Sequence, residues 1–106
     1  MAKYLIEGSY TADGIKGVLK EGGTGRRAAV TEALKGLGGK IDSMYYAFGD
    51  TDVYLIVDAP DNLTMAAVAM GVAATGAVRI KTTVLLTPEE IDQATKKTVA
   101  YRAPGR

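Results

Sequence analysis

Hydrophobic and polar residues alternate in two stretches of this chain, and a period of two is typical of β-strands with one covered face. The alternation runs through residues 2–10 and again through residues 77–86. A third stretch, residues 53–57, is apolar at five successive positions. An unbroken apolar run predicts a strand that is covered on both faces, so we expect this segment near the centre of a sheet.

The central strand belongs to a predicted hairpin. A strand over about residues 40–48 precedes it, and a second strand over about residues 51–59 contains the apolar run. Between them, Gly49 to Asp52 have the composition of a tight turn. Pro60 ends the second strand, because proline has no backbone N–H to donate to a sheet.

Apolar residues recur at helical spacing on either side of this hairpin. The first helical segment follows Thr11, is interrupted at Gly22-Gly23 and ends at Gly38-Gly39. The second, about residues 62–75, follows the capping residue Asp61 and contains no charged side chain. A helix that is apolar all round is normally buried on more than one side, so we expect another surface to cover it.

A terminal helix is predicted over residues 88–100. Thr87, Pro88 and Glu90 form a capping box with proline at the first helical position. Residues 101–106 follow as a tail without a regular pattern.

The resulting order, β-α-β-β-α-β plus a terminal helix, predicts an α+β, ferredoxin-like fold with a four-stranded antiparallel sheet. Residues 1–106 would form a single domain with its core in residues 2–87. Both long helices would cover one face of the sheet. The other face is too apolar for water and too polar for a dry core, so we expect a second copy of the chain to cover it in a dimeric α+β barrel. By parity that face carries Leu5, Glu7, Tyr54, Ile56, Lys81 and Leu85.

Composition excludes several kinds of chemistry. The 106 residues include no cysteine and no histidine, which removes disulfides, thiol catalysis, a histidine base and the usual ligands of zinc and haem. We therefore expect no metal and no cofactor. The net charge of +1, without a block of like charges, argues against nucleic-acid binding. No apolar segment is long enough to suggest a signal peptide or a membrane span, so we expect a cytoplasmic protein.

Three segments together resemble the GYD-domain family. They are RRAAVTEALKGLGGKI leading into MYYAFG, then FGDTDVYLIVDAPD followed by an Ala-rich helix, and finally TGAVRIKTT. The resemblance covers about residues 3–88 and implies a small ferredoxin-like protein of the dimeric α/β-barrel type, without assigning a reaction. The family signature is Gly-x-Tyr-Asp; here Gly49 and Asp52 match it, and Thr51 stands at the tyrosine position.

Five residues are candidates for a ligand site walled by the sheet and the broken first helix. Arg26 and Arg27 follow the glycine break and could neutralise an acidic ligand. Tyr45 and Tyr46 place one phenol on each face of the sheet, with Tyr4, Tyr10 and Tyr54 as further contributors. Asp52 could orient or deprotonate the ligand. The alternative is structural: solvated arginines, aromatic core and aspartates that shape the turn.

Two other carboxylates, Glu7 and Asp58, lie on the central strands and could act as bases with raised pKa values. The alternative is ion pairing with Lys3, Arg79 or Lys81. The sequence does not decide between these two interpretations.

Three functions remain open at this point. The first is a homo-oligomeric protein that binds a small anionic organic compound without catalysis. The second is a cofactor-independent isomerase or monooxygenase of the dimeric α/β-barrel type. The third is a structural assembly protein in which the uncharged second helix is an interface. The sequence does not decide whether the chain is an enzyme.

Overall fold

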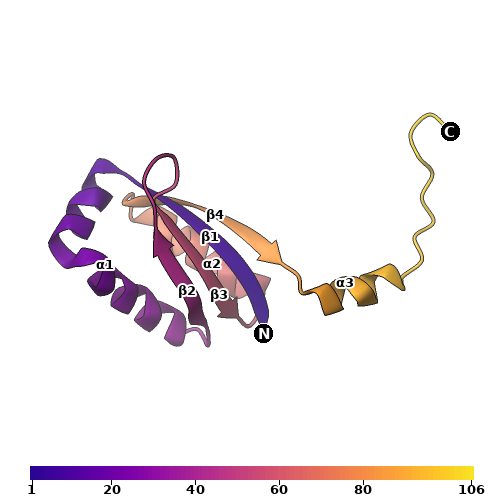
Figure 1. The fold of residues 1–106 in the computed structure, drawn as a ribbon, viewed down its shortest axis with the longest axis horizontal. Coiled ribbons are helices and arrows are strands. Elements are labelled where there is room, and N and C mark those ends of the chain that lie inside the picture. Colours follow the sequence, from indigo (N-terminus) through magenta and orange to yellow (C-terminus); the bar gives the residue numbers. More distant parts are fainter.

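A computed structural model describes residues 1–106 (Figure 1). Its elements follow the predicted order: β1 (Ala2–Tyr10), α1 (Ala12–Lys35), β2 (Lys40–Tyr46), β3 (Val53–Ala59), α2 (Asn62–Ala74), β4 (Val78–Leu85) and α3 (Pro88–Thr95).

The four strands form one antiparallel sheet in the order β2-β3-β1-β4. This order confirms the ferredoxin-like fold, with β1 and β3 at the centre. The apolar run lies in a central strand, because β3 pairs with β2 on one side and with β1 on the other. Val53, Leu55 and Val57 of this run are buried under the helices, while its other residues face the uncovered side. Leu5 of β1 pairs with Ile56 of β3, and Tyr4 pairs with Val57. A bulge between Ile41 and Ser43 interrupts the β2–β3 ladder.

The core lies between the sheet and its two long helices, and α2 runs behind the sheet in Figure 1. Tyr4, Leu34 and Val57 are its largest fully buried side chains. Tyr4 can be buried because its hydroxyl donates a hydrogen bond of 2.6 Å to Oδ1 of Asn62. Burying the hydrophobic body of a tyrosine is favourable when the hydroxyl keeps a partner.

Helix α1 is broken where the sequence predicts. Gly22 has φ 78° and ψ 168°, so the segment consists of two helical halves joined at this residue. That conformation is essentially restricted to glycine. Thr11 caps the first half, because its side chain accepts a hydrogen bond from the backbone N–H of Gly14 at 3.2 Å.

Two predicted boundaries were wrong. The hairpin strands are shorter at the turn than expected, since β2 ends at Tyr46 and β3 begins at Val53. The intervening loop is held through Asp52, whose N–H donates to the carbonyl of Gly8 and whose carbonyl accepts from Ala47. The terminal helix ends at Thr95 rather than residue 100. None of its residues is buried, so no packing extends the helix beyond its capped first turns.

The sheet face away from the helices is uncovered within one chain. It carries the residues expected from parity, and Tyr45 and Tyr54 are both exposed on it. Beyond β4, α3 and the tail project away from the body of the molecule (Figure 1). The largest dimension of the chain is therefore 56 Å, against 33 and 22 Å in the other directions.

Candidate functional site

An apolar cavity of about 100 Å³ lies between the sheet, the second half of α1 and helix α2. Eleven of the thirteen residues that line it are hydrophobic, so its walls cannot satisfy a buried charge. The lining comes from every layer of the fold and includes Ile6, Val30, Met44, Leu55, Val68 and Val72.

Arg26 and Tyr10 bring polar atoms to this apolar cavity. Arg26 lies in the second half of α1, four residues after the kink, and Tyr10 is the last residue of β1. The guanidinium Nη1 of Arg26 also lies 3.3 Å from Oε1 of Glu21. The cavity thus has a mainly apolar lining that includes one cationic side chain, and this side chain is paired with Glu21.

The surroundings of Tyr10 raise the pKa of its phenol. Partial burial raises its pKa above the ordinary value of 10.0, and the nearby Tyr46 phenol adds to the rise, while the positive charge of Arg26 opposes it. At neutral pH the hydroxyl therefore stays protonated and can donate a hydrogen bond.

Tyr46 contacts the kink of α1 directly. Its hydroxyl donates a hydrogen bond of 3.2 Å to the carbonyl of Gly23. A Cβ atom at Gly23 would lie only 3.1 Å from the Tyr46 ring, so a residue without a side chain allows this close approach. The kink and the last residue of β2 are thereby fastened together beside the cavity.

A second, open hollow of about 270 Å³ lies on the outer side of this contact. It groups Arg27 with Tyr45 and Tyr46, together with Gly23, Thr24 and Met44. Met44 lines both spaces, so the hollow adjoins the inner cavity. Of the five predicted site residues, Arg26 thus faces the cavity, whereas Arg27, Tyr45 and Tyr46 surround the hollow.

Asp52 lines neither space. Its carboxylate Oδ2 accepts a hydrogen bond of 2.8 Å from the backbone N–H of Tyr10. The neighbouring carbonyl of Asp50 accepts a hydrogen bond of 2.6 Å from the Ser9 hydroxyl. These contacts fasten the hairpin loop to the end of β1, which is the strand end that carries Tyr10.

Comparison with known proteins identifies the family. The model of the GYD domain matches residues 4–95, which is most of the chain. The protein belongs to the GYD domain family. No curated protein and no solved structure matches the chain.

In this GYD domain the segment Gly49 to Asp52 lies in the hairpin loop, which spans residues 47–52. Thr51, at the tyrosine position of the signature, lies on the uncovered side of the sheet. It lines a polar hollow there with Glu7, Ser9, Arg79 and Lys81. Thr51 is not among the residues lining the cavity or the outer hollow.

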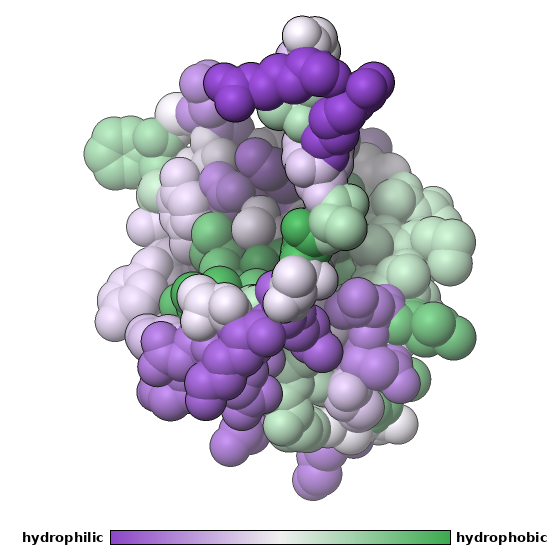
Figure 2. All heavy atoms as spheres, turned by 90° about the vertical axis from the view of Figure 1, so that its right-hand side faces the viewer, coloured by the Kyte–Doolittle hydropathy of each residue, from purple (hydrophilic) through white to green (hydrophobic).

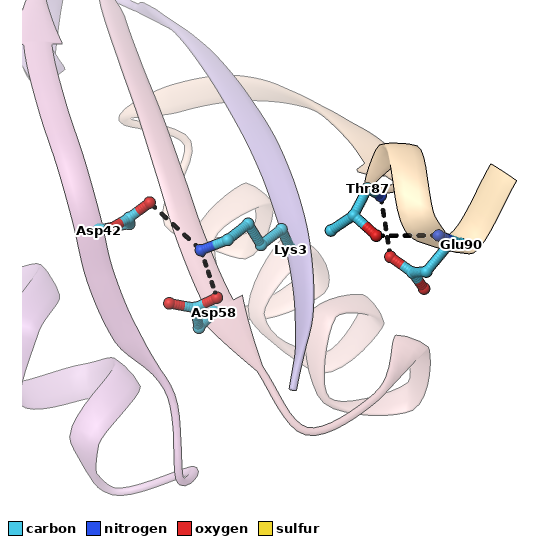
Figure 3. Close-up of polar contacts among 5 residues, drawn as sticks. All are labelled: Lys3, Asp42, Asp58, Thr87 and Glu90. Atoms are coloured by element: carbon cyan, nitrogen blue, oxygen red, sulfur yellow. Dashed lines mark hydrogen bonds and ion pairs between the residues drawn. The ribbon is translucent and has the colours of Figure 1, made fainter. Parts of the chain in front are cut away.

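The central carboxylate Asp58 is paired with a lysine. The Nζ atom of Lys3 lies 2.9 Å from Asp58 and 3.2 Å from Asp42, so one ammonium group joins three strands of the GYD domain (Figure 3). The hydrogen bond that Lys3 donates to Asp58, followed by the one that it donates to Asp42, raises the pKa of Lys3. For Asp58 the ion-pair interpretation is therefore correct.

Two further findings bear on the possible chemistry of the GYD domain. No group of three or more acidic side chains lies close enough together to hold a metal ion. None of the helices has the length and apolar character needed to span a lipid bilayer.

The valines that make the cavity were not predicted from the sequence, and Tyr10 was predicted only as a possible contributor. The alternation in β1 puts Tyr10 on the covered face of the sheet, which was the available signal. The cavity itself had no such signal, because Val30 lies on α1 and Val68 and Val72 lie on α2, so they meet only after packing.

Proposed function

We propose that this GYD domain protein binds a small organic anion that has an apolar body, and that it does so as a homo-oligomer without catalysis. One observation carries the proposal: an apolar cavity has a single cationic side chain, Arg26, and a protonated phenol, Tyr10, in its lining. An amphiphilic anion presents the complementary pair of surfaces.

Each part of the site has a role in this proposal. The cavity of about 100 Å³ accepts a short apolar group, since a dry apolar cavity of roughly 150 Å³ can hold a benzene ring. Arg26 pairs with the carboxylate or phosphate of the ligand, and the Tyr10 hydroxyl donates to it. Arg27, Tyr45 and Tyr46 contact any part of the ligand that extends into the outer hollow. Asp52 acts indirectly by fixing the backbone of Tyr10.

The catalytic alternative has less support. A cofactor-independent isomerase or monooxygenase of this barrel type needs a group that accepts a proton near neutral pH. The raised pKa of Tyr10 keeps its phenol protonated, and the Asp52 carboxylate already accepts the Tyr10 N–H. These groups suit recognition of a ligand better than proton abstraction.

Binding can be measured by isothermal titration of the full chain with a series of short aliphatic and aromatic carboxylates. The corresponding uncharged amides serve as matched ligands. We expect the acids to bind and the amides to bind at least tenfold more weakly, since a hydrogen bond to a charged group contributes about 1.5–3 kcal/mol.

The matched variants are Arg26→Ala and Arg102→Ala, the second of which removes an exposed charge from the C-terminal tail. Arg26→Ala should weaken binding of an acid about tenfold or more, whereas Arg102→Ala should leave it unchanged. Equal affinity of Arg26→Ala and the parent chain would reject the anion-binding role.

Self-association is the second part of the proposal. The uncovered sheet face carries Leu5, Ile56 and two exposed tyrosines, Tyr45 and Tyr54, and a second copy can cover it. Sedimentation equilibrium should then give a mass of at least two chains of 11.1 kDa at micromolar concentration. A single-chain mass would refute this part and leave the ligand site to be judged by the titrations.

A further inference from the structure

The segment after β4, residues 86–106, is here called the C-terminal arm. Its helix α3 has only eight residues, and isolated helices shorter than about 12 residues are marginal in water. The larger apolar side chains of the arm are nevertheless uncovered: Val99 is 78% and Tyr101 is 74% exposed, and Leu86 and Ile91 are also exposed. The arm therefore has an apolar side without a partner in its own chain.

A groove between α2 and β4 has the complementary property. It has a volume of about 140 Å³ and is lined by no charged residue. This α2–β4 groove is formed by Tyr4, Asn62, Met65, Ala66, Ala69, Thr82 and Val84. Val84 on its β4 wall is 51% exposed, so the groove leaves apolar surface open to water.

One residue that lines the groove carries an unsatisfied polar atom. The Oγ1 atom of Thr82 is buried and has no hydrogen-bond partner. Because this atom is shielded from solvent, a group that enters the groove gains apolar contacts rather than a hydrogen bond to it.

The apolar surface continues from the groove onto the outer side of α2. Leu63 and Met70 on this helix are 82% and 69% exposed, and the helix has no charge. Figure 2 looks at the molecule from the side of the arm and shows green, apolar surface in the middle and along the right edge, between purple polar groups. A surface of this kind is typical of an interaction site rather than of a free face.

We propose that the C-terminal arm of one copy packs into the α2–β4 groove of a second copy. Ile91 and Ala94 lie on one side of α3 and would enter the groove. Thr95 lies one turn after Ile91, and its hydroxyl is already satisfied within the helix, since it donates to the carbonyl of Asp92 at 2.7 Å. The acidic residues Glu89 and Asp92 lie on other sides of the helix and would remain in water.

The direction of the arm explains why the second copy, rather than the same chain, receives it. Only Leu86 and Thr87 join β4 to α3. The capping box holds Thr87 in an extended conformation, with φ −74° and ψ 158°. The Thr87 N–H donates to the Glu90 carboxylate at 2.9 Å, and the Thr87 hydroxyl accepts from the Glu90 N–H at 3.1 Å (Figure 3). Pro88 also restricts the preceding residue to extended conformations. Leu86 is then the only residue between β4 and α3 without such a restraint, and the arm projects away from the body of its own chain (Figure 1).

Disulfide cross-linking tests this packing directly. The chain has no cysteine, so a cysteine introduced by substitution is its only thiol. Ile91→Cys and Val84→Cys are prepared as separate variants, one of them isotopically labelled, and are mixed under mild oxidation. We expect a mixed disulfide between a labelled and an unlabelled chain, identified by mass spectrometry, because the two side chains would lie within bonding distance. Ala69→Cys replaces Val84→Cys if circular dichroism shows that the latter is unfolded.

The control partner is Ala28→Cys, an exposed position on α1 that reports random collision. A yield of the Ile91–Val84 pair no higher than that of the Ile91–Ala28 pair would overturn the proposal. A double variant with both cysteines in one chain that forms a disulfide within that chain would also overturn it. So would preferential coupling of Ile91→Cys to Ile56→Cys, because Ile56 lies on the uncovered sheet face instead of the groove.

Discussion

Replacing Gly22 by alanine tests whether the break in α1 is part of the native structure. Gly22 has φ 78° and ψ 168°, a region that residues with a Cβ atom rarely enter. Apart from its chain neighbours and the nearby backbone of its own helix, no atom lies within 4 Å of the position that the Cβ would occupy. The cost of the substitution is therefore backbone strain alone, about 1–3 kcal/mol of unfolding free energy.

The same helix offers a matched control. Gly17 has helical geometry and equally free space around its Cβ position. Gly17→Ala should stabilise the protein by about 0.5–1 kcal/mol, because alanine loses less conformational entropy in a helix. The two alanine variants should therefore differ by roughly 1.5–4 kcal/mol, although each adds the same methyl group to the same helix.

Urea denaturation followed by circular dichroism measures both changes, at one protein concentration because association affects apparent stability. In thermal melts, each kcal/mol corresponds to about 4–8 °C for a domain near this size. If Gly22→Ala proves as stable as Gly17→Ala, α1 is a continuous helix in solution. The close contact of Tyr46 with Gly23, and the cavity beside it, would then need a different geometry.

Three other predictions concern the core, a helix cap and the site. Leu34→Ala should lower the free energy of unfolding by about 2–5 kcal/mol, whereas Leu19→Ala, on the exposed side of α1, should change it by less than about 0.5 kcal/mol, both measured in urea. Hydrogen bonds from the backbone N–H and the hydroxyl of Thr64 lower the pKa of Asp61 below 3.8. The stability that Asp61 contributes is therefore present above pH 3.8 and is lost as the pH falls through the folded-state pKa. Asp61→Asn keeps a capping side chain and should remove this part of the acid dependence; an unchanged profile would contradict the assignment. In ultraviolet titrations Tyr10 should ionise above pH 10.0, and Arg26→Ala should raise its pKa further, whereas an unchanged value would show that the two side chains do not interact.

The sequence predicted the architecture because local patterns and the global fold agree in this chain. Alternation placed Tyr4 and Ile6 toward the helices, the apolar run placed β3 at the centre, and the glycine pair marked the kink in α1. The ends of helices that do not pack on the core were harder to predict. Helix α3 ends at Thr95 because no tertiary contact extends it, and the sequence carries no local signal for that end.

The site was predictable only in part. Arg26 and Tyr46 could be grouped because both were expected beside the glycine break, and the structure brings them there. The roles of individual side chains depend on register, which no local pattern reveals. Asp52 looked like a ligand-contacting group, yet its carboxylate is bonded to the backbone of Tyr10. The cavity depends on tertiary packing of residues far apart along the chain.

The bulge in β2 has a consequence for how this chain tolerates changes of length. Asp42 is the additional residue between Ile41 and Ser43, and its removal would leave a regular ladder with Tyr46 still beside the kink. Loss of a residue between Ser43 and Tyr45 would instead turn every later side chain of the strand to the opposite face. Tyr45 and Tyr46 would exchange environments, and the kink would lose its aromatic contact. In β2, therefore, only the deletion of Asp42 keeps the tyrosines in place. That deletion would remove one of the two carboxylates that pair with Lys3.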